Sequence, residues 1–556
     1  MEIWSERGSG NFTGFGEEVI IKTDVFKGRL PRIEPHLLPE NGAQVADNLT
    51  VESGAIRPFN VPLFNATPTK VGTKLSLHRF GGAYWFHWIT DVNAVRGPIA
   101  DNAAEVTYFT GDGAPKVTDS SIAVQGGGTN YPNAAYLLGV PAPTSAPGTS
   151  VQGASVDPTQ AEDRVYVVTF VAQIGSIEME GPPSPVSGAV TVEPSQTVAL
   201  ALPGIPAGAY NFTKKRIYRT AYAGAAGSTE YKLVGEALAA SLTFTDNVAG
   251  VSLGGTLQST EWDAPPASMH SLGLHPGGFM FGADGMDLCV SVAYQPHAWP
   301  ASWRHKLDYP IVVAVMAGNS ILVTTTGKPY LIVGTSPDTL DKEPIEINQA
   351  CVSKRGMVNV GYAAVYPSPD GLMMVGPGIA KNATEALMRR EDWQAYKPST
   401  ILGAWHDGKY FGFYDTGTVQ AGFIFDPATE DFTDIDVYAT AVFTEKITDT
   451  LFLQVGNDIV AWNSGATKQA MTWRGKVNQL PYPANMGAAQ VFADGYPVTF
   501  KLYADGVLRH TEEVVGRAAF RLPGGYLADR YEVEFSGVNA ITSFSLVESA
   551  QELKRT

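Results

Sequence analysis

The sequence predicts an all-β protein, and three observations support this fold class. Apolar and polar residues alternate with period two through much of the chain, as in Met286, Leu288, Val290 and Val292. Turn-forming pairs such as Asp-Gly separate the alternating runs. The 58 Gly and 37 Pro follow no strict period and long helical patterns are scarce, so these residues indicate turns between strands.

The stretch 274–300 contains one complete hairpin pattern that recurs along the chain. Asp284-Gly285 forms a tight turn between two alternating runs, because an Asp-Gly pair tolerates the positive φ that such a turn needs. Similar turns fall at Gly318-Asn319, Asp370-Gly371, Asp407-Gly408 and Gly456-Asn457. Their average spacing is about 43 residues, which is typical of four-stranded propeller blades. Because one blade cannot bury both faces alone, we predict a β-propeller of roughly six to eight blades.

Changes in texture divide the chain into five predicted parts. Residues 1–30 are Gly-rich and predict an N-terminal arm. A Pro-rich connector at 136–147 and a change of pattern after Trp473 mark the other boundaries. The predicted parts are the arm (1–30), the first propeller blades (31–150), an inserted β-sandwich (151–262), the remaining blades (263–478) and a C-terminal β domain (479–556).

The first predicted blades contain several local signals. Pro39 can open one short helical turn with Ala43, Val45 and Ala46, and a strand is expected over 55–59. His78 and His87 flank a Gly-Gly turn near two tryptophans. A metal or catalytic role would need a third ligand or a carboxylate partner, so we interpret both as half-buried strand histidines.

Residues 151–262 have their own all-β pattern. Long strands are expected in VYVVTFVAQIG, KRIYRTAYAG and TEYKLVGE, with the Pro-rich turn EGPPSP between the first two. Such strands over about 110 residues are typical of a small sandwich. The run DRVYVVTFVAQIGSIEMEGPPSP resembles a fibronectin type III module. Because the hairpin series resumes afterwards, we interpret this part as an insertion between blades.

Charge and cysteine content limit the function classes. The 39 Lys and Arg against 55 Asp and Glu give a net charge of −16, opposite to that of a protein that grips phosphates. Cys289 and Cys351 are the only cysteines, too few for a disulfide framework, which fits folding in a reducing compartment. There is neither a signal-peptide pattern nor a run of about 18 apolar residues. We expect a soluble protein without a membrane segment.

Few residues are spaced for catalysis. His-Glu-x-x-His, Gly-x-Ser-x-Gly, Walker, Cys-x-x-Cys and calcium-loop motifs are absent from the sequence. Paired carboxylates at Asp434 and Asp436, or at Glu261 and Asp263, allow glycoside hydrolysis in principle. Such pairs are more often solvated strand and loop residues. Trp299 and Trp303 offer either a carbohydrate platform or a wedge between neighbouring units, and we favour the wedge.

Seven segments resemble one family of tail proteins from tailed bacteriophages. They look like the tail nozzle, or tail tubular protein B, type of short-tailed phages. The segments are LPENGAQVADNLTVESGAIRP (38–58), YLLGVPAPTSAP (136–147), AYQPHAWP (293–300), GKPYLIVG (327–334), CVSKRGMV (351–358), YPSPDGLMMVG (366–376) and FRLPGGYLADRYEVEFSG (520–537).

This resemblance implies a structural virion protein, made in the host bacterial cytoplasm and assembled into the tail. It implies a homohexameric ring below the portal and adaptor, contacts with other tail proteins including fibres, and a channel through which genomic DNA passes without stable binding. It implies no catalytic, cofactor-binding or metal-binding residue, and we assign none. The alternative is a propeller-based tail protein that binds or depolymerises host glycans.

Overall fold

The computed structural model describes residues 20–99, 105–126, 129–220 and 230–554. Strands dominate, and the α-helices within these ranges are α1 (Ser120–Ala123) and α2 (Arg390–Gln394). The predicted all-β class is therefore confirmed. No helix in the described ranges has the length and apolarity to cross a membrane. The chain forms two compact units, residues 1–61, 423–436 and 463–556 in the first, and residues 62–422 and 437–462 in the second.

Two sheets with a common core form the first unit. One sheet has the order β1-β47-β42-β45, and the other contains β36-β2-β40-β46-β43-β44 with β41 paired to β46. The strands are β1 (Ile20–Thr23), β2 (Ala43–Asp47), β3 (Leu49–Thr50), β4 (Arg57–Pro58), β36 (Phe432–Ile435), β40 (Met471–Gly475), β41 (Asn478–Ala484), β42 (Ala488–Ala493), β43 (Val498–Ala504), β44 (Val507–Val514), β45 (Phe520–Arg521), β46 (Ala528–Gly537) and β47 (Ile541–Val547).

The core of the first unit follows from alternation along its strands. In β43, Val498, Phe500 and Leu502 are buried, and the intervening residues are only partly covered. Trp473 on β40 packs edge-on against Phe26, with ring centroids 4.9 Å apart. The sequence places Ala43, Val45 and Ala46 in a helical turn, but these residues lie in β2. The prediction is wrong there because the backbone of β2 pairs with β40.

The second unit contains a series of small antiparallel sheets. Four of them are four-stranded meanders, with orders β11-β10-β9-β8, β21-β22-β23-β24, β25-β26-β27-β28 and β29-β30-β31-β32. The hairpin β6-β7, the pair β33-β34 and the sheet β37-β38-β39-β5 complete the series. Strand β35 (Gln420–Phe425) carries the chain into the first unit.

The strands of these sheets are β5 (Leu63–Ala66), β6 (Ser76–Phe80), β7 (Tyr84–Trp88), β8 (Asn93–Arg96), β9 (Thr107–Thr110), β10 (Lys116–Thr118), β11 (Tyr136–Leu137), β21 (His270–Leu274), β22 (Met280–Asp284), β23 (Asp287–Val290), β24 (His305–Lys306), β25 (Ile311–Ala317), β26 (Ser320–Thr325), β27 (Tyr330–Val333), β28 (Asp341–Pro344), β29 (Val358–Asn359), β30 (Ala364–Pro367), β31 (Leu372–Gly376), β32 (Ile379–Asn382), β33 (Leu402–His406), β34 (Lys409–Asp415), β37 (Ala441–Glu445), β38 (Thr450–Val455) and β39 (Asp458–Ala461).

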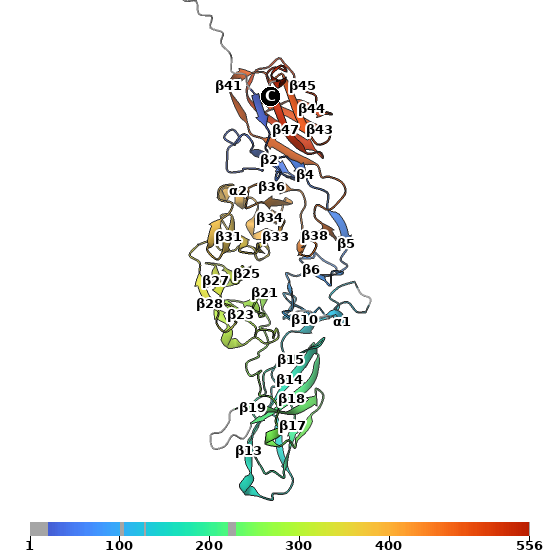
Figure 1. Ribbon diagram of the computed structural model, residues 1–556, viewed down its shortest axis with the longest axis vertical. Coiled ribbons are helices and arrows are strands. Elements are labelled where there is room, and N and C mark those ends of the chain that lie inside the picture. The colour runs from blue at the N-terminus through green and yellow to red at the C-terminus, as the bar shows by residue number, and fades with distance from the viewer. Residues whose placement is uncertain (1–19, 100–104, 127–128, 221–229, 555–556) are drawn as a thin grey trace, which may run out of the picture. The chain divides into compact units, whose positions relative to one another are not determined.

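The first strands of successive sheets lie next to one another. β8 adjoins β21, followed in turn by β25, β29, β33, β37 and β6. Ser76 Oγ on β6 accepts from Val92 N at 2.8 Å, one residue before β8 begins. Figure 1 shows these sheets arranged around a common centre. We call the seven first strands the inner strands.

Turn chemistry explains the hairpins. β33 and β34 are joined by Asp407 and Gly408, whose φ angles are 50° and 70°. Positive φ at both positions is what a two-residue turn between antiparallel strands requires. The hairpins predicted at Asp284-Gly285, Gly318-Asn319, Asp370-Gly371 and Gly456-Asn457 are likewise present. These local predictions are confirmed.

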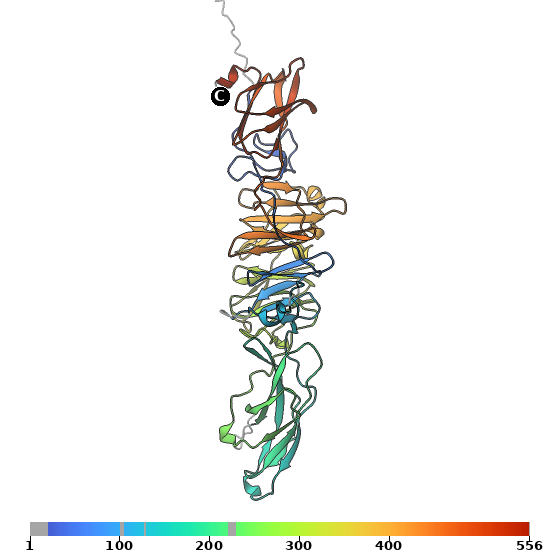
Figure 2. The same cartoon turned by 90° about the vertical axis from the view of Figure 1, so that its right-hand side faces the viewer.

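Strands β12 to β20 form a β module between β11 and β21. Its sheets have the orders β12-β17-β20, β13-β16 and β15-β14-β18-β19. In Figure 2 most of its strands, coloured cyan to green, run in nearly the same line. The strands are β12 (Gly148–Gln152), β13 (Glu162–Arg164), β14 (Tyr166–Ile174), β15 (Ile177–Glu180), β16 (Val190–Val192), β17 (Thr197–Ala201), β18 (Phe212–Thr220), β19 (Tyr231–Leu238) and β20 (Thr243–Asp246).

The module has a core of its own. Val168, Val198 and Ile217 come from three of its strands and are buried together. A buried ion pair lies beside this core, with Arg219 Nη1 2.7 Å from Asp246 Oδ2. The Tyr166 hydroxyl donates to the same carboxylate oxygen at 2.7 Å. Multiple donors offset the desolvation of Asp246.

The opposite end of the module packs on the neighbouring sheets. Phe170 and Met179 belong to the same buried cluster as Met280 and Trp299, which lie in and after β22-β23. Trp299 is 1% exposed, and its Nε1 donates to Pro296 O at 2.9 Å. The tryptophan therefore acts as the predicted wedge.

The compact units divide the chain differently from the predicted parts. Residues 31–61, assigned by sequence to the first blades, lie in the first unit together with the C-terminal strands. The reason is long-range pairing, since β2 pairs with β40 and β1 with β47. Residues 1–19 of the predicted arm lie outside the described residues.

We predict that residues 148–262, expressed alone, fold cooperatively. The core around Val168, Val198 and Ile217 and the Arg219–Asp246 pair are internal to this segment. Thermal unfolding followed by circular dichroism should show one sigmoidal transition. Replacing Ile217 by Ala should lower the unfolding free energy by about 2–5 kcal/mol, because it opens a cavity in that core. A featureless melt of the unsubstituted segment would show that it depends on the neighbouring sheets.

Candidate functional site

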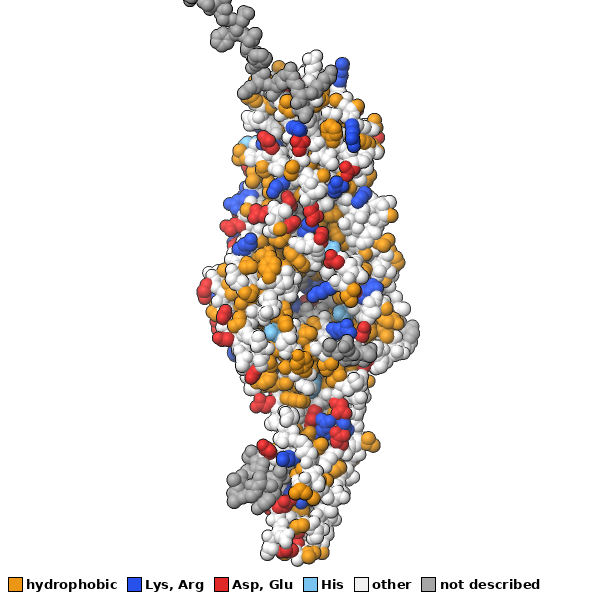
Figure 3. Space-filling model, viewed as in Figure 1, with side chains coloured by type: hydrophobic (Ala, Val, Ile, Leu, Met, Phe, Trp, Pro, Cys, Tyr) orange, Lys and Arg blue, Asp and Glu red, His pale blue; other side chains and the backbone are white. Residues whose placement is uncertain are grey.

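A small cavity lies among the inner strands of the second unit. Its volume is about 160 Å³, and it is bordered by residues of five inner strands, the segments leading into them and the 3-10 turn η4 (Lys354–Gly356). Figure 3 shows a hollow at the centre of the sheets, with Lys and Arg side chains near its rim. We call it the axial cavity. Its polar lining residues are Ser76, Asp91, Asn93, Lys354 and Arg355.

Arg355 connects two parts of the cavity wall. Its Nη2 donates to Leu75 O at 2.8 Å and also to Thr440 O. Leu75 directly precedes β6, and Thr440 directly precedes β37. Burial lowers the pKa of Arg355 from its usual value, and Asp91 opposes this change. The guanidinium keeps its charge, because the ordinary pKa of Arg lies far above neutrality.

Lys354 and Asp91 form the ion pair of the cavity. Lys354 Nζ lies 2.9 Å from Asp91 Oδ2, and both side chains are partly exposed. Asn93, two residues beyond Asp91, accepts from Ser271 N through Oδ1 at 3.1 Å. Ser271 has a φ of 57°, a left-handed backbone that is uncommon for serine. The wall is therefore built from polar contacts between β8, β21 and η4.

A larger pocket of about 600 Å³ lies beside the hairpin β6-β7. Arg79 is fixed in it, since its Nε and Nη2 donate to Gly82 O at 2.9 and 2.7 Å. The guanidinium also stacks 4.9 Å from the ring of Trp85. Burial lowers the pKa of His78 to about 4, so His78 is neutral at physiological pH.

The predicted strand location of both histidines is confirmed. His78 lies on β6 against Phe443, with ring centroids 5.7 Å apart. His87 lies on β7 and is fully buried, rather than half-buried, with its Nδ1 3.0 Å from Trp85 O. The structure brings neither histidine to a metal site, and no group of three or more possible ligands occurs within the described ranges.

The carboxylates of the first pair have separate partners in the first unit. Asp434 Oδ2 accepts from Arg29 Nη1 at 2.5 Å, and Asp436 Oδ2 accepts from Asn48 Nδ2 at 2.6 Å. Asp47 lies beside both. Burial, followed by the charges of Asp434 and Asp436, raises the pKa of Asp47 to about 6. These contacts join β36 to the segments around β2.

The second carboxylate pair holds a loop of the second unit. Glu261 Oε2 accepts from Ser302 Oγ at 3.0 Å, and Asp263 Oδ2 accepts from Ala301 N at 3.3 Å. Both acceptors thus hold η3 (Ala301–Trp303), the turn that follows the Trp299 wedge. Trp303 packs against the neighbouring buried cluster.

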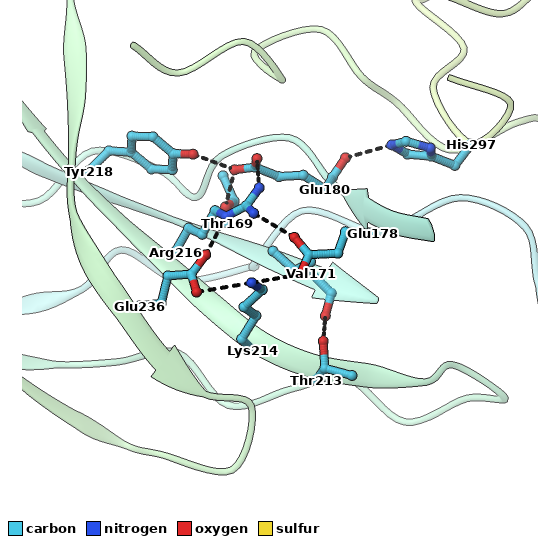
Figure 4. A network of polar contacts seen from close by, with 10 residues as sticks. All are labelled: Thr169, Val171, Glu178, Glu180, Thr213, Lys214, Arg216, Tyr218, Glu236 and His297. Carbon is cyan, nitrogen blue, oxygen red and sulfur yellow. Dashed lines mark hydrogen bonds and ion pairs between the residues drawn. The ribbon is translucent and has the colours of Figure 1, made fainter. Parts of the chain in front are cut away.

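A charged network on the module was not predicted from the sequence. Arg216 contacts Glu178, Glu180 and Glu236 at 2.7, 2.7 and 2.9 Å (Figure 4). Lys214 contacts Glu178 and Glu236 at 2.7 and 2.9 Å. These residues occupy β15, β18 and β19, so the network crosses three strands of one sheet.

The network reaches the neighbouring sheets through Glu180. Its main-chain oxygen lies 3.2 Å from His297 Nε2, as Figure 4 shows. His297 is almost fully buried, and burial lowers its pKa to about 4. A neutral imidazole donates this hydrogen bond without a buried charge.

Sequence reasoning also missed the axial cavity. Lys354 and Arg355 lie in CVSKRGMV, which was notable only for its family resemblance. The local signal that could have indicated this cavity is the adjacent cationic pair, Lys354 and Arg355, within a mostly apolar stretch. Their convergence with Asp91 depends on strands that are far apart in the sequence.

No family model and no curated protein matches the chain. Solved structures match at low similarity. The extracellular domain of a putative hybrid two-component system from B. thetaiotaomicron is 9% identical with a TM-score of 0.25, over 85% of this chain. This chain spans only 50% of that structure.

Two further solved structures are similar at the same level. PorZ, a bacterial surface component of the type-IX secretion system of Porphyromonas gingivalis, is 10% identical with a TM-score of 0.25, over 89% of this chain and 82% of that one. The AfRom2 CNH domain is 9% identical with a TM-score of 0.24, over 61% and 90%. Scores this low establish neither a shared fold nor a shared function.

We predict that Asp47→Asn stabilises the first unit above neutral pH. The pKa of Asp47 is 3.8 when unperturbed and about 6 in the folded protein. A raised pKa means that the stability from the protonated group is present below 3.8 and is lost as the pH rises through 6. The free energy of unfolding of the variant should therefore exceed that of wild type by roughly 1–3 kcal/mol at pH 7.5. At pH 4 the two free energies should be equal.

Asp24→Asn is the matched control, because Asp24 is exposed and forms a surface ion pair with Lys22. Calorimetry across this pH range measures the difference. If Asp47→Asn is less stable than wild type at pH 7.5, then attraction to Arg29 outweighs the burial and repulsion of the carboxylate.

Proposed function

We propose that the sheets of the second unit form a seven-bladed β-propeller. The observation that supports this most strongly is the last sheet, in which β5 pairs with β39. A strand from the start of the unit thereby completes a sheet whose other strands come from its end. The succession of inner strands provides the second support. The β module between β11 and β21 is then a fibronectin type III-like insertion between blades.

We further propose that the protein is a structural component of a bacteriophage tail, of the nozzle or hub type. The resemblance of seven segments to tail nozzle proteins carries this proposal. Several of these segments contain residues that hold neighbouring strands together, as expected of a structural protein. AYQPHAWP carries the Trp299 wedge, and CVSKRGMV carries Arg355.

The passage for DNA belongs to an assembly of copies. The axial cavity has a volume of only about 160 Å³. A duplex, whose major groove alone is about 12 Å wide, does not fit there. We therefore propose that six copies form a cyclic ring with a channel between them, each copy offering one surface to a different surface of the next. Portal and adaptor proteins lie above it, and fibres attach to it.

We predict that antibody to this protein labels the tail of the virion. Negative-stain images of labelled particles should show label close to the capsid vertex, and averaged end views of the tail should show sixfold symmetry. Antibody to a major capsid protein is the control. Label on fibre tips, together with glycan binding by the purified protein, would instead support the alternative role on the host surface.

We predict negligible binding of double-stranded DNA at physiological salt. The net charge of −16 repels phosphates, and a conduit works best without sites at which a sliding duplex dwells. Mobility-shift titration at low and moderate salt measures this. Tight binding that weakens steeply with salt would reveal a basic surface and contradict the repulsive-conduit mechanism.

A further inference from the structure

We propose that the axial cavity binds one small tetrahedral oxyanion of the phosphate or sulfate type. This goes beyond a structural role in a tail and does not depend on it. The proposal starts from Arg355. A guanidinium has five N–H donors, and the two on Nη2 go to Leu75 O and Thr440 O. Within the described ranges, the donors on Nε and Nη1 have no protein acceptor.

Charge in the cavity favours an anion. Its formal charges are those of Lys354, Arg355 and Asp91, which sum to +1. Asp91 is paired with Lys354 at 2.9 Å, so the charge of Arg355 has no carboxylate of its own in the lining. Arg355 is half-buried and shares the carboxylate of Asp91 with Lys354, so a bound anion would give these two cations a second counter-ion.

A neutral donor supplements the two cations. Asn93 Oδ1 accepts from Ser271 N, which fixes the amide orientation and leaves Nδ2 as a donor at the cavity wall. Guanidinium, ammonium and amide N–H groups are the donors that recognise oxyanions, and charge-assisted bonds of this kind are roughly twice as strong as neutral ones. The carboxylate of Asp91 opposes the anion because it carries a negative charge.

Size and access are consistent with a free ion. A volume of about 160 Å³ accommodates a five-atom oxyanion with little additional water. Figure 3 shows a hollow at the surface in this region, with Lys and Arg side chains near its rim. The proposed ligand is a free ion and not a phosphate of duplex DNA, because the net charge of −16 disfavours DNA binding.

The anion would also join parts of the cavity wall. Its donors come from η4 and from β8, while Arg355 already holds the lead-in segments of β6 and β37. Binding is therefore expected to raise the melting temperature, since a ligand that binds only the folded state stabilises it.

Isothermal titration calorimetry of the full chain with phosphate, and with sulfate, at neutral pH tests the proposal. Chloride at matched ionic strength is the reference. One site per chain is expected, with a melting temperature higher in phosphate than in chloride. The absence of saturable phosphate and sulfate binding at millimolar concentration overturns the proposal.

Four variants locate the site. Arg355→Gln and Lys354→Met should each weaken phosphate binding about tenfold or more, because each removes charged donors. Asp91→Asn should strengthen it, because it removes the opposing carboxylate and frees Lys354. Lys381→Met, on the exposed strand β32, should leave it unchanged.

If Lys354→Met weakens phosphate binding and Asp91→Asn strengthens it, these residues act on the anion directly. If their ion pair had a purely structural role, both substitutions would weaken phosphate binding or destabilise the fold. This comparison stands even if Arg355→Gln does not fold. Equal affinity in Lys354→Met, Asp91→Asn and wild type would contradict the proposal and assign the measured binding to another place.

Discussion

The pairing of β5 with β39 joins the start of the second unit to its end. Without it, the sheet β37-β38-β39 keeps an unpaired edge, and the two ends of the strand series lack main-chain hydrogen bonds between them. Arg355 joins the same two ends at the cavity wall, since its acceptors directly precede β6 and β37. The ends are therefore held twice, by a strand pair and by one guanidinium. Closing so long a loop costs entropy, which both contacts must offset.

The module between β11 and β21 combines two kinds of interaction. Its far part has a core and a buried ion pair of its own, whereas Phe170 and Met179 share a core with Trp299 of the neighbouring sheets. Glu180 connects the charged network of the module to the neighbouring sheets. Its carboxylate binds Arg216, and its main-chain oxygen accepts a hydrogen bond from His297. Apolar burial supplies most of the stability of this junction, and the directional polar contacts fix its register.

Local chemistry was predictable from the sequence, and long-range pairing was not. Asp407-Gly408 forms its turn for reasons contained in two residues, and Trp299 could be recognised as a wedge from its Pro-rich surroundings. The sequence predicts a short helical turn that includes Ala43, Val45 and Ala46 because Pro39 can open it, but the pairing of β2 with β40 overrides that weak local preference. Nothing near β2 in the sequence indicates β40. The axial cavity was missed for the same reason, since Arg355 and Asp91 meet only after distant strands have assembled.

The order of synthesis gives the β5 pairing a further consequence. Ala66 leaves the ribosome about 400 residues before its partner Ile459. At about 5–20 residues per second, β5 waits roughly 20 to 80 seconds for the strand it must join. Leu63 and Phe64 stay exposed even in the finished fold, at 52% and 61%. During that interval the nascent chain presents an apolar, unpaired segment, and exposed segments of this kind are prone to aggregation.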